Sequence, residues 1–186
     1  MSILSEVAEI RDTVAPMSVD FYHASSEMGW IDENVELLRG IPLQKMSKSP
    51  LHEYLVRFFL RLIDEALPQG FFITKESPLT TSDSEPEPDL MVVKGSETDF
   101  RDHHPGTAEL VIEVSINTEE RDRTKASIYA EAQVDEYWIV LPEKKEILVY
   151  TQSNGREYEQ RRTITSGKAE SKTVAGLAVF VPEVFE

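Results

Sequence analysis

The sequence predicts a mixed β-sheet flanked by helices, on the border between the α+β and α/β classes. Three observations indicate this fold: a long amphipathic helix over 50–67, an apolar strand that runs directly into a second helix over 108–133, and alternating strands after it. At 186 residues the chain can bury a sizeable core without further stabilisation. We therefore expect a single domain over 1–186.

The first third of the chain predicts a short helix, a hairpin and a long helix. Residues 19–28 have a loose helical pattern and follow an N-terminal start that we expect to be mobile. The stretch "NVELLRGIPLQKM" indicates two short strands joined around Gly40 and Pro42, since glycine supplies the turn and proline resists a central strand position. From Pro50, apolar residues recur at steps of three and four, which places them on one face of a helix.

The middle of the chain predicts strands at 71–75 and 89–93, separated by a loop rich in Ser, Pro and acidic residues that we expect to be polar and mobile. A strand is expected at 108–115. The helix after it has Asn117 as the expected N-cap and Glu120 three residues later, close to a capping box. The apolar run "EYWIVL" then suits a central strand that is covered on both faces.

The C-terminal part predicts a hairpin that turns at "SNG", followed by an apolar tail, "TVAGLAVFVPEVFE", that forms an edge strand. Within the single domain we therefore distinguish an N-terminal extension (1–33), a core (34–141) and a C-terminal hairpin with its edge strand (142–186).

The composition and the N-terminal sequence exclude several structural features and kinds of site. The absence of cysteine excludes disulfides, thiolate metal sites and cysteine nucleophiles, and it suits a cytoplasmic location. The N-terminus lacks the basic start and apolar stretch of a signal peptide, and no run approaches the roughly 18 apolar residues of a membrane span, so we expect no membrane partner.

The net charge of -15 disfavours a polyanionic partner, because nonspecific binding of nucleic acid depends mainly on Lys and Arg. The distribution is uneven, however. Residues 76–102 contain eight acids against two basic residues, whereas residues 39–48 contain three basic residues and no acid. Each cluster taken alone is typical of a solvated surface.

Two carboxylates stand out because they lie in apolar strands. Alternation along 109–115 puts Glu113 on the same face as Val111 and Ser115, opposite Leu110. A half-buried carboxylate there needs a cation or hydrogen-bond donors. Asp89 opens the preceding strand, so the two acids can meet if the two strands pair. Such a pair is suited to Mg²⁺ or Mn²⁺, with phosphate and water as the remaining ligands.

The spacing also predicts a cation near this pair. If the helix begins near Thr118 and folds back over the sheet, Lys125 lies about 10 Å along the helix axis and its side chain can reach the carboxylates. Asp122 and Tyr129 share that helical face. Taken singly, each residue has an ordinary explanation: Asp89 as a strand-start aspartate, Glu113 as half of an ion pair, and Lys125 as a solvated lysine.

At this point the sequence resembles a known family. The stretches "VELLRGIPLQKMSKSPLHEYLV", "PDLMVV", "ELVIEVS" and "RDRTKASIYAEAQVDEYWIV" are similar to the Uma-two-like family of restriction endonucleases, in the PD-(D/E)xK nuclease superfamily, over 34–141. The resemblance implies a restriction-endonuclease-like core, with Asp89 and Glu113 as metal-binding acids and Glu36 near the site. The usual lysine two positions after the glutamate is replaced here by Ser115, and Lys125 matches a displaced position on the next helix.

The resulting hypothesis is a Mg²⁺- or Mn²⁺-dependent endonuclease that acts on nucleic acid, with DNA as the expected substrate and Asp89, Glu113 and Lys125 as its catalytic residues. His52 and Tyr129 are additional candidates, although His52 lies off the apolar stripe, where a surface histidine is the ordinary expectation. The resemblance and the apolar tail together predict a homodimer. Two alternatives stay open: a noncatalytic dimeric module with the same fold, and a metal-dependent phosphodiesterase acting on a smaller phosphate ester.

Overall fold

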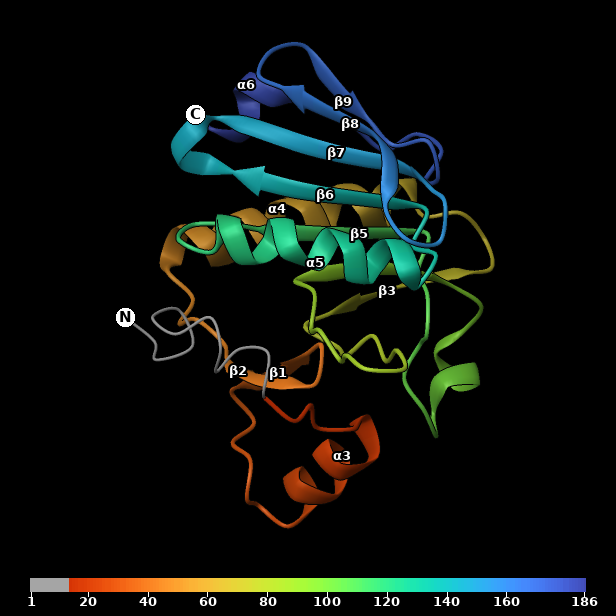
Figure 1. The fold of residues 1–186 in the computed structure, drawn as a ribbon. Coiled ribbons are helices and arrows are strands. Elements are labelled where there is room, and N and C mark those ends of the chain that lie inside the picture. Colours follow the sequence, from red (N-terminus) through yellow and green to blue (C-terminus); the bar gives the residue numbers. More distant parts are fainter. Residues whose placement is uncertain (1–13) are drawn as a thin grey trace.

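The computed structural model describes residues 14–186, and a six-stranded mixed sheet forms its centre (Figure 1). The strand order is β3-β4-β5-β6-β7-β8. β5 and β6 run parallel, and the other neighbouring pairs are antiparallel. The predicted mixed sheet is therefore confirmed. The strands are β3 (Phe71–Lys75), β4 (Leu90–Lys94), β5 (Leu110–Val114), β6 (Glu136–Leu141), β7 (Glu146–Ser153) and β8 (Tyr158–Ile164).

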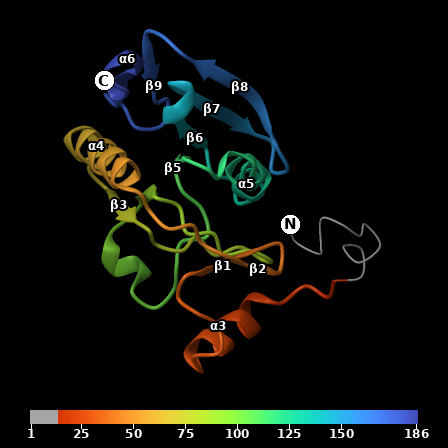
Figure 2. The ribbon, with the colours of Figure 1, turned by 90° about the vertical axis from the view of Figure 1, so that its left-hand side faces the viewer.

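Two long helices cover opposite faces of this sheet, α4 (Pro50–Ala66) on one face and α5 (Glu119–Glu131) on the other (Figure 2). The hydroxyl of Ser49 caps α4 by accepting a hydrogen bond from the His52 backbone N–H at 3.2 Å. The apolar stripe of α4 is confirmed, because one face of the helix is buried against the sheet. Its buried residues are Leu55, Val56, Phe59 and Ile63.

The strand β5 has the predicted alternation. Leu110, Ile112 and Val114 belong to the core on the α4 side, whereas Val111 belongs to the core on the α5 side. Glu113 therefore points toward α5. Because β5 and β6 are parallel, the chain needs a crossover between them, and α5 provides it.

The start of α5 differs from the expected capping box. The N-cap is Thr118 rather than Asn117, and no side chain caps the helix there. The Thr118 hydroxyl instead donates to Asp122 Oδ2 at 2.6 Å. This hydrogen bond to a buried carboxylate explains why the Thr118 hydroxyl does not cap the backbone of the helix.

The N-terminal part lies on the β3 side of the sheet, below it in the view of Figure 1. It consists of α3 (Val19–Glu27) and the hairpin of β1 (Val35–Leu38) and β2 (Ile41–Gln44), as predicted. Gly40 occupies the turn with φ +72°, and a side chain there would clash with Pro16. The mobile start that we expected falls on residues 1–13, which lie outside the described residues.

The acid-rich loop between β3 and β4 is more enclosed than predicted. Ser84 and Glu85 are buried, and Glu85 forms a β-bridge with Leu37 of the hairpin. The Glu85 carboxylate also accepts hydrogen bonds from Thr80 at 2.5 Å and His23 at 2.7 Å. The expectation of a solvated acidic surface is wrong for this residue, because the N-terminal elements cover it.

The C-terminal tail does not form an edge strand of the main sheet. β9 (Lys168–Glu170) and β10 (Ala178–Phe180) pair with each other in a separate two-stranded sheet, and the chain ends in α6 (Val181–Val184). The tail's buried side chains, Val179, Val181 and Val184, pack into the core on the α4 side. The tail thus contributes to the core of its own chain, and the homodimer stays a prediction.

Two short 3-10 helices complete the described chain, η1 (Glu97–Phe100) and η2 (Pro142–Lys144). No helix in the described range combines the length and the apolar character that a membrane crossing requires.

Candidate active site

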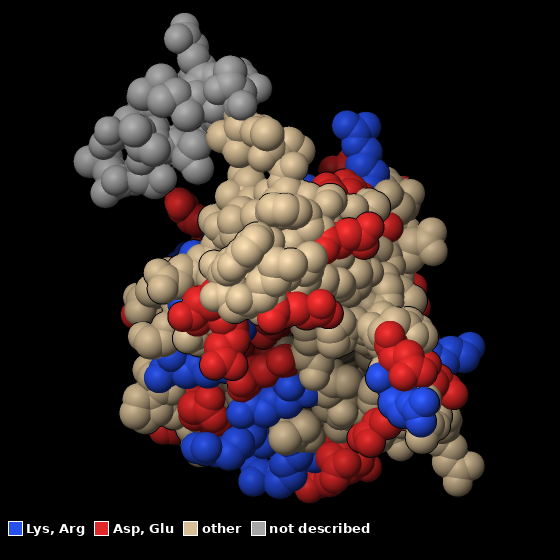
Figure 3. All heavy atoms as spheres, turned by 90° about the horizontal axis from the view of Figure 1, so that it is seen from below, with Lys and Arg blue, Asp and Glu red and all other residues tan. Residues whose placement is uncertain are grey.

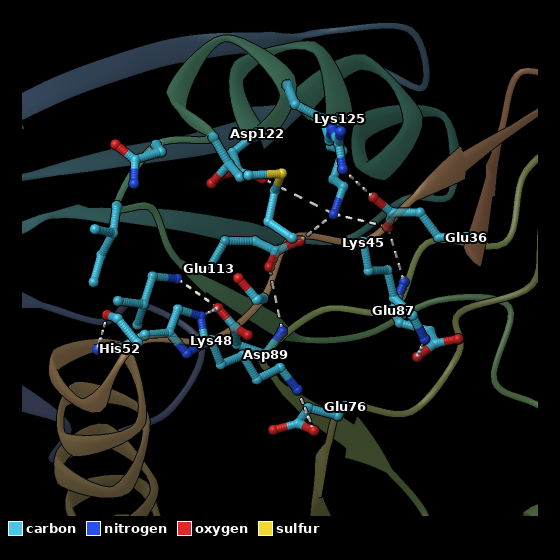
Figure 4. A pocket seen from close by; sticks show the side chains of 18 of the residues that line it. Glu36, Lys45, Lys48, His52, Glu76, Glu87, Asp89, Glu113, Asp122 and Lys125 are labelled. Atoms are coloured by element: carbon cyan, nitrogen blue, oxygen red, sulfur yellow. Dashed lines mark hydrogen bonds and ion pairs between the residues drawn. The ribbon is translucent and has the colours of Figure 1, made fainter. Parts of the chain in front are cut away.

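The structure brings Asp89 and Glu113 together. The pairing of β4 with β5 matches Leu90 to Ile112, so Asp89 and Glu113 are adjacent across the two strands (Figure 4). The Asp89 backbone N–H donates to Glu113 Oε2 at 3.3 Å, and the Val114 backbone N–H donates to Asp89 Oδ2 at 2.7 Å. Backbone groups of each strand thus hold the carboxylate of the other strand.

Lys125 reaches this pair from the second turn of α5. Its Nζ lies 3.0 Å from Glu113 Oε1, 2.9 Å from Glu36 Oε2 and 3.9 Å from Asp122 Oδ1. Glu36 comes from β1, so the N-terminal hairpin contributes to the site. Lys125 is only 4% exposed. It is therefore not the solvated lysine that its position alone suggests, because this face of α5 packs onto the sheet.

Negative charge exceeds positive charge in the buried part of the site. Glu36, Asp89, Glu113 and Asp122 are all buried, and among the described residues the buried cation beside them is Lys125. Burial raises the pKa of Glu113 to about 8, although Lys125 acts in the opposite direction. Burial also raises the pKa of Asp122. Burial lowers the pKa of Lys125, but the nearby Glu113 and Glu36 carboxylates outweigh it and raise the pKa above its ordinary value. Lys125 thus stays protonated.

His52 and Tyr129 also contact the two acids. His52 Nε2 lies 3.1 Å from Asp89 Oδ2, and its side chain is 13% exposed. It is not a surface histidine, because the first turn of α4 directs it at Asp89. The Tyr129 hydroxyl donates to Glu113 Oε1 at 2.9 Å from behind the pocket. Burial raises the pKa of Tyr129 well above its ordinary value, so the hydroxyl remains a donor.

Ser115 is placed differently from the other candidates. It is buried, and its hydroxyl contacts the Thr118 hydroxyl at 3.2 Å. Ser115 does not line the pocket that contains Asp89 and Glu113. It lines a neighbouring depression beside the start of α5. Ser115 therefore supports the beginning of the helix that carries Lys125.

The acids and Lys125 line a pocket of about 430 Å³ whose mouth carries further charged side chains. Lys45 Nζ lies 2.7 Å from Glu87 Oε2, and Arg121 Nη1 lies 3.7 Å from Glu36 Oε1. Lys48 forms an ion pair with Glu76. Figure 3, which views the molecule from the end with α3 and the hairpin, shows Lys and Arg side chains interleaved with Asp and Glu.

The sequence did not identify these residues of the mouth as parts of the site. The signal available for two of them was the acid-free basic run at 39–48, which contains Lys45 and Lys48. Asp122 was identified only as a helical neighbour of Lys125, and the i,i+3 spacing of the two residues was its signal.

The donor set fits a hard divalent cation. Asp89 Oδ1 accepts no hydrogen bond from the described residues, and Glu113 Oε2 accepts one long bond, so each acid keeps an oxygen for a ligand. In the described part of the chain, no group of three or more His, Asp or Glu side chains is arranged so that it could hold a metal ion. Two carboxylates are nevertheless sufficient for Mg²⁺, which usually keeps several waters and uses substrate phosphate as a further ligand. A divalent cation would also offset the excess negative charge.

Comparison with known proteins assigns the chain to a family. The model of the Uma2 family, described as "Putative restriction endonuclease", matches residues 28–180. The chain belongs to the Uma2 family. The match includes Glu36, Asp89, Glu113 and Lys125, so the whole buried cluster lies within the family region. No protein with a curated description matches this Uma2 chain.

One solved structure shows the fold of this Uma2 protein. A "putative nuclease belonging to DUF820" from Anabaena variabilis ATCC 29413 superposes with a TM-score of 0.76 at 15% identity, covering 91% of this chain and 98% of its own. The type IIG restriction endonuclease BpuSI gives a TM-score of 0.36 at 14% identity, over 59% of this chain and 12% of its own. The first similarity shows a shared fold, and the second is too low to support an argument.

Proposed function

We propose that this Uma2 protein is a metal-dependent endonuclease that hydrolyses phosphodiester bonds in nucleic acid. The observation that carries the proposal is the pair of adjacent carboxylates, Asp89 and Glu113, each with an oxygen left for a ligand and with the ammonium of Lys125 held 3.0 Å from Glu113. Membership of a family described as restriction endonucleases supports the same reaction class.

Asp89 and Glu113 would hold the metal ion, Mg²⁺ or Mn²⁺. When bound there, such an ion polarises a phosphoryl oxygen and makes water a stronger nucleophile. The overall reaction adds water across a phosphorus–oxygen ester bond: the water oxygen bonds to phosphorus, the ester bond breaks, and a proton from the water ends on the leaving oxygen. No covalent enzyme intermediate is needed.

Lys125 would act as a fixed positive charge. Because its pKa is raised, it stays protonated at neutral pH and cannot serve as a general base. Its ammonium can instead orient water and stabilise the negative charge that grows on the phosphate. Glu36 holds the other side of the same ammonium at 2.9 Å, so the charge is positioned before substrate arrives.

The substrate that we propose is DNA, bound with its phosphates near the cations at the pocket mouth. Each of these cations is already paired with an acid, and the net charge is -15, so binding should be weak unless a divalent cation bridges the phosphate to the carboxylates. A homodimer and a cytoplasmic location stay predictions. The first rests on the family resemblance and the second on the absence of cysteine.

The test is incubation of the purified protein with plasmid and with single-stranded DNA, in Mg²⁺, in Mn²⁺ and in excess chelator. We expect cleavage with metal, none with chelator, and none with Asp89→Asn. Asp102→Asn, which changes an exposed aspartate, is the matched control and should cleave like the wild type. Lack of cleavage under every condition, with bound metal demonstrated separately, would favour the noncatalytic module. Cleavage of a small phosphodiester alone would favour the phosphodiesterase.

A further inference from the structure

In each of the two acids one oxygen is held by two donors, whereas the other accepts, among the described residues, none (Asp89 Oδ1) or one long hydrogen bond of 3.3 Å from a backbone N–H (Glu113 Oε2). Asp89 Oδ2 lies 2.7 Å from the Val114 backbone N–H and 3.1 Å from His52 Nε2. Glu113 Oε1 lies 2.9 Å from the Tyr129 hydroxyl and 3.0 Å from Lys125 Nζ. The complementary oxygens, Asp89 Oδ1 and Glu113 Oε2, belong to carboxylates that line the pocket (Figure 4).

The contacts of His52 fix its tautomer. Nε2 faces a carboxylate oxygen that can only accept, so Nε2 carries a proton. Nδ1 is buried and has no hydrogen-bond partner among the described residues. A proton on Nδ1 would be a buried N–H without an acceptor among the described residues, so the contacts favour Nε2 as the donor nitrogen.

A buried Nδ1 without a hydrogen-bond partner destabilises the folded protein. A histidine at this position is therefore poorly explained by a purely structural role. An apolar side chain of similar size would fill the same place without that cost. The one bond that the ring makes, to Asp89, is therefore the feature that distinguishes histidine from an apolar residue here.

Tyr129 has the same relation to Glu113. Its side chain is fully buried on α5, and its hydroxyl donates to Glu113 Oε1. The ring centroids of Tyr129 and its neighbour Tyr137 are 4.8 Å apart. The Tyr137 hydroxyl donates to the backbone carbonyl of Asp122 at 2.9 Å. The two tyrosines are equally buried but differ in their hydrogen bonds. Of the two, only Tyr129 donates to a proposed metal ligand, the Glu113 carboxylate.

We infer that His52 and Tyr129 are positioning residues that select which oxygens of Asp89 and Glu113 face the bound ion. The inference rests on the proposed function and extends it to residues other than the two proposed metal ligands. By occupying Asp89 Oδ2 and Glu113 Oε1, they leave Oδ1 and Oε2 as the ligand pair. Donors of this kind typically change metal affinity by about 10- to 100-fold when they are removed.

The experiment measures Mn²⁺ affinity by calorimetry and Tm in chelator for four variants of the site. His52→Leu and Tyr129→Phe remove the donors, and we expect Mn²⁺ affinity to fall about 10- to 100-fold in each. His52→Gln places an amide N–H near the position of Nε2 and should retain most of the affinity. His52→Asn places its amide near Nδ1, too far back to reach Asp89, and should resemble His52→Leu.

Two matched controls separate positioning from stability. His23→Leu removes a histidine that contacts a buried carboxylate, Glu85, outside the pocket, and Tyr137→Phe removes the neighbouring buried hydroxyl. Both should bind Mn²⁺ like the wild type. His52→Leu should keep the wild-type Tm, because it removes the unpartnered Nδ1 together with the bond.

Wild-type affinity in His52→Leu and Tyr129→Phe would overturn the inference and leave the proposed function standing. Equal affinity in His52→Gln and His52→Asn, or losses that simply follow Tm in all variants and controls, would also overturn it. Failure of the wild type to bind Mn²⁺ is a different result, because it would overturn the proposed function itself.

Discussion

At the scale of single residues, the site depends on one lysine among several acids. Lys125 contacts Glu36 and Glu113 within 3.0 Å, and Asp122 lies 3.9 Å away. Removing the lysine would leave buried carboxylates without their cation, which is far more costly than removing a surface charge. The same ammonium is therefore expected to matter for both stability and catalysis.

Lys125→Met tests both roles. We expect the free energy of unfolding in chelator to fall by about 3–5 kcal/mol, because breaking a buried ion pair leaves uncompensated charge. Cleavage should be lost, and Mn²⁺ should stabilise the variant at least as strongly as the wild type, since the ion supplies the missing charge. Urea unfolding with and without Mn²⁺, together with the plasmid assay, measures these effects.

Lys125→Arg is the matched variant for Lys125→Met. It keeps the charge but not the compact ammonium, so it should recover little cleavage. Full cleavage by Lys125→Met would remove this lysine from the mechanism.

The raised pKa of Glu113 predicts a pH-dependent stability. Burial raises its pKa from an ordinary 4.5 to about 8, so between these values the folded protein holds a proton that the unfolded chain has released. The free energy of unfolding should therefore fall as pH rises through this window, by at most about 1.4 kcal/mol per pH unit. Glu113→Gln lacks the proton and should not show this contribution.

The measurement is urea unfolding of the wild type and Glu113→Gln in chelator, from about pH 5 to pH 8. We expect the wild type to lose stability relative to Glu113→Gln as pH rises. Parallel stability curves for the two proteins would show that Glu113 keeps an ordinary pKa.

At the scale of secondary-structure elements, the sequence predicted the parts whose local pattern matches their packing. The period-2 pattern of β5 placed Glu113 opposite Leu110 and Ile112, and the stripe of α4 identified its buried face. Pairing of two strands was enough to bring Asp89 to Glu113. The reach of Lys125 followed from helix geometry alone.

The failed predictions concern contacts that no local pattern encodes. His52 lies off the apolar stripe of α4, but Asp89, which directly precedes β4, is close enough to contact its ring. Glu36 does lie at the site, as the family resemblance implied, but the position of its hairpin depends on long-range packing that its local pattern does not encode. The tail has the pattern of a strand, but its short pairing with β9 and the turn into α6 result from contacts with the α4-side core.

The tail gives a test at this scale. Val181 is fully buried at the start of α6, whereas the adjacent Phe180 is 43% exposed. We expect Val181→Ala to lower the free energy of unfolding by about 2 kcal/mol, through lost burial and a small cavity. Phe180→Ala is the neighbouring control and should cost clearly less. Equal, small losses in urea unfolding would indicate that the tail is not part of the core.

At the scale of the whole molecule, the free edges of the sheet bear on the predicted homodimer. The exposed residues of edge strand β8 include Glu159, Arg161 and Arg162, and such charges disfavour pairing with another chain. The opposite edge strand, β3, is mostly apolar and half-buried, and a groove lies beside it. The groove is lined by apolar residues that include Phe71, Phe72 and Ile73, and by the charged residues Arg57, Arg61, Asp64 and Glu97. A dimer would therefore be expected to form at β3 rather than through the tail.

Light scattering at micromolar concentration tests the predicted dimer. We expect a mass near twice the 21.2 kDa of the chain. A monomer mass with wild-type metal binding would show that the site is complete within one chain and would remove the dimer from the account.

The central claim is that Asp89 and Glu113 together form a divalent metal site, and calorimetric titration with Mn²⁺ tests it most directly. The titration compares the wild type, Asp89→Asn, Glu113→Gln and the exposed control Asp102→Asn, at a pH above 8 so that Glu113 is ionised. We predict one Mn²⁺ ion per chain for the wild type and the control, with binding lost or strongly weakened in both site variants. Equal Mn²⁺ affinity in all four proteins, or none in the wild type, would contradict the account.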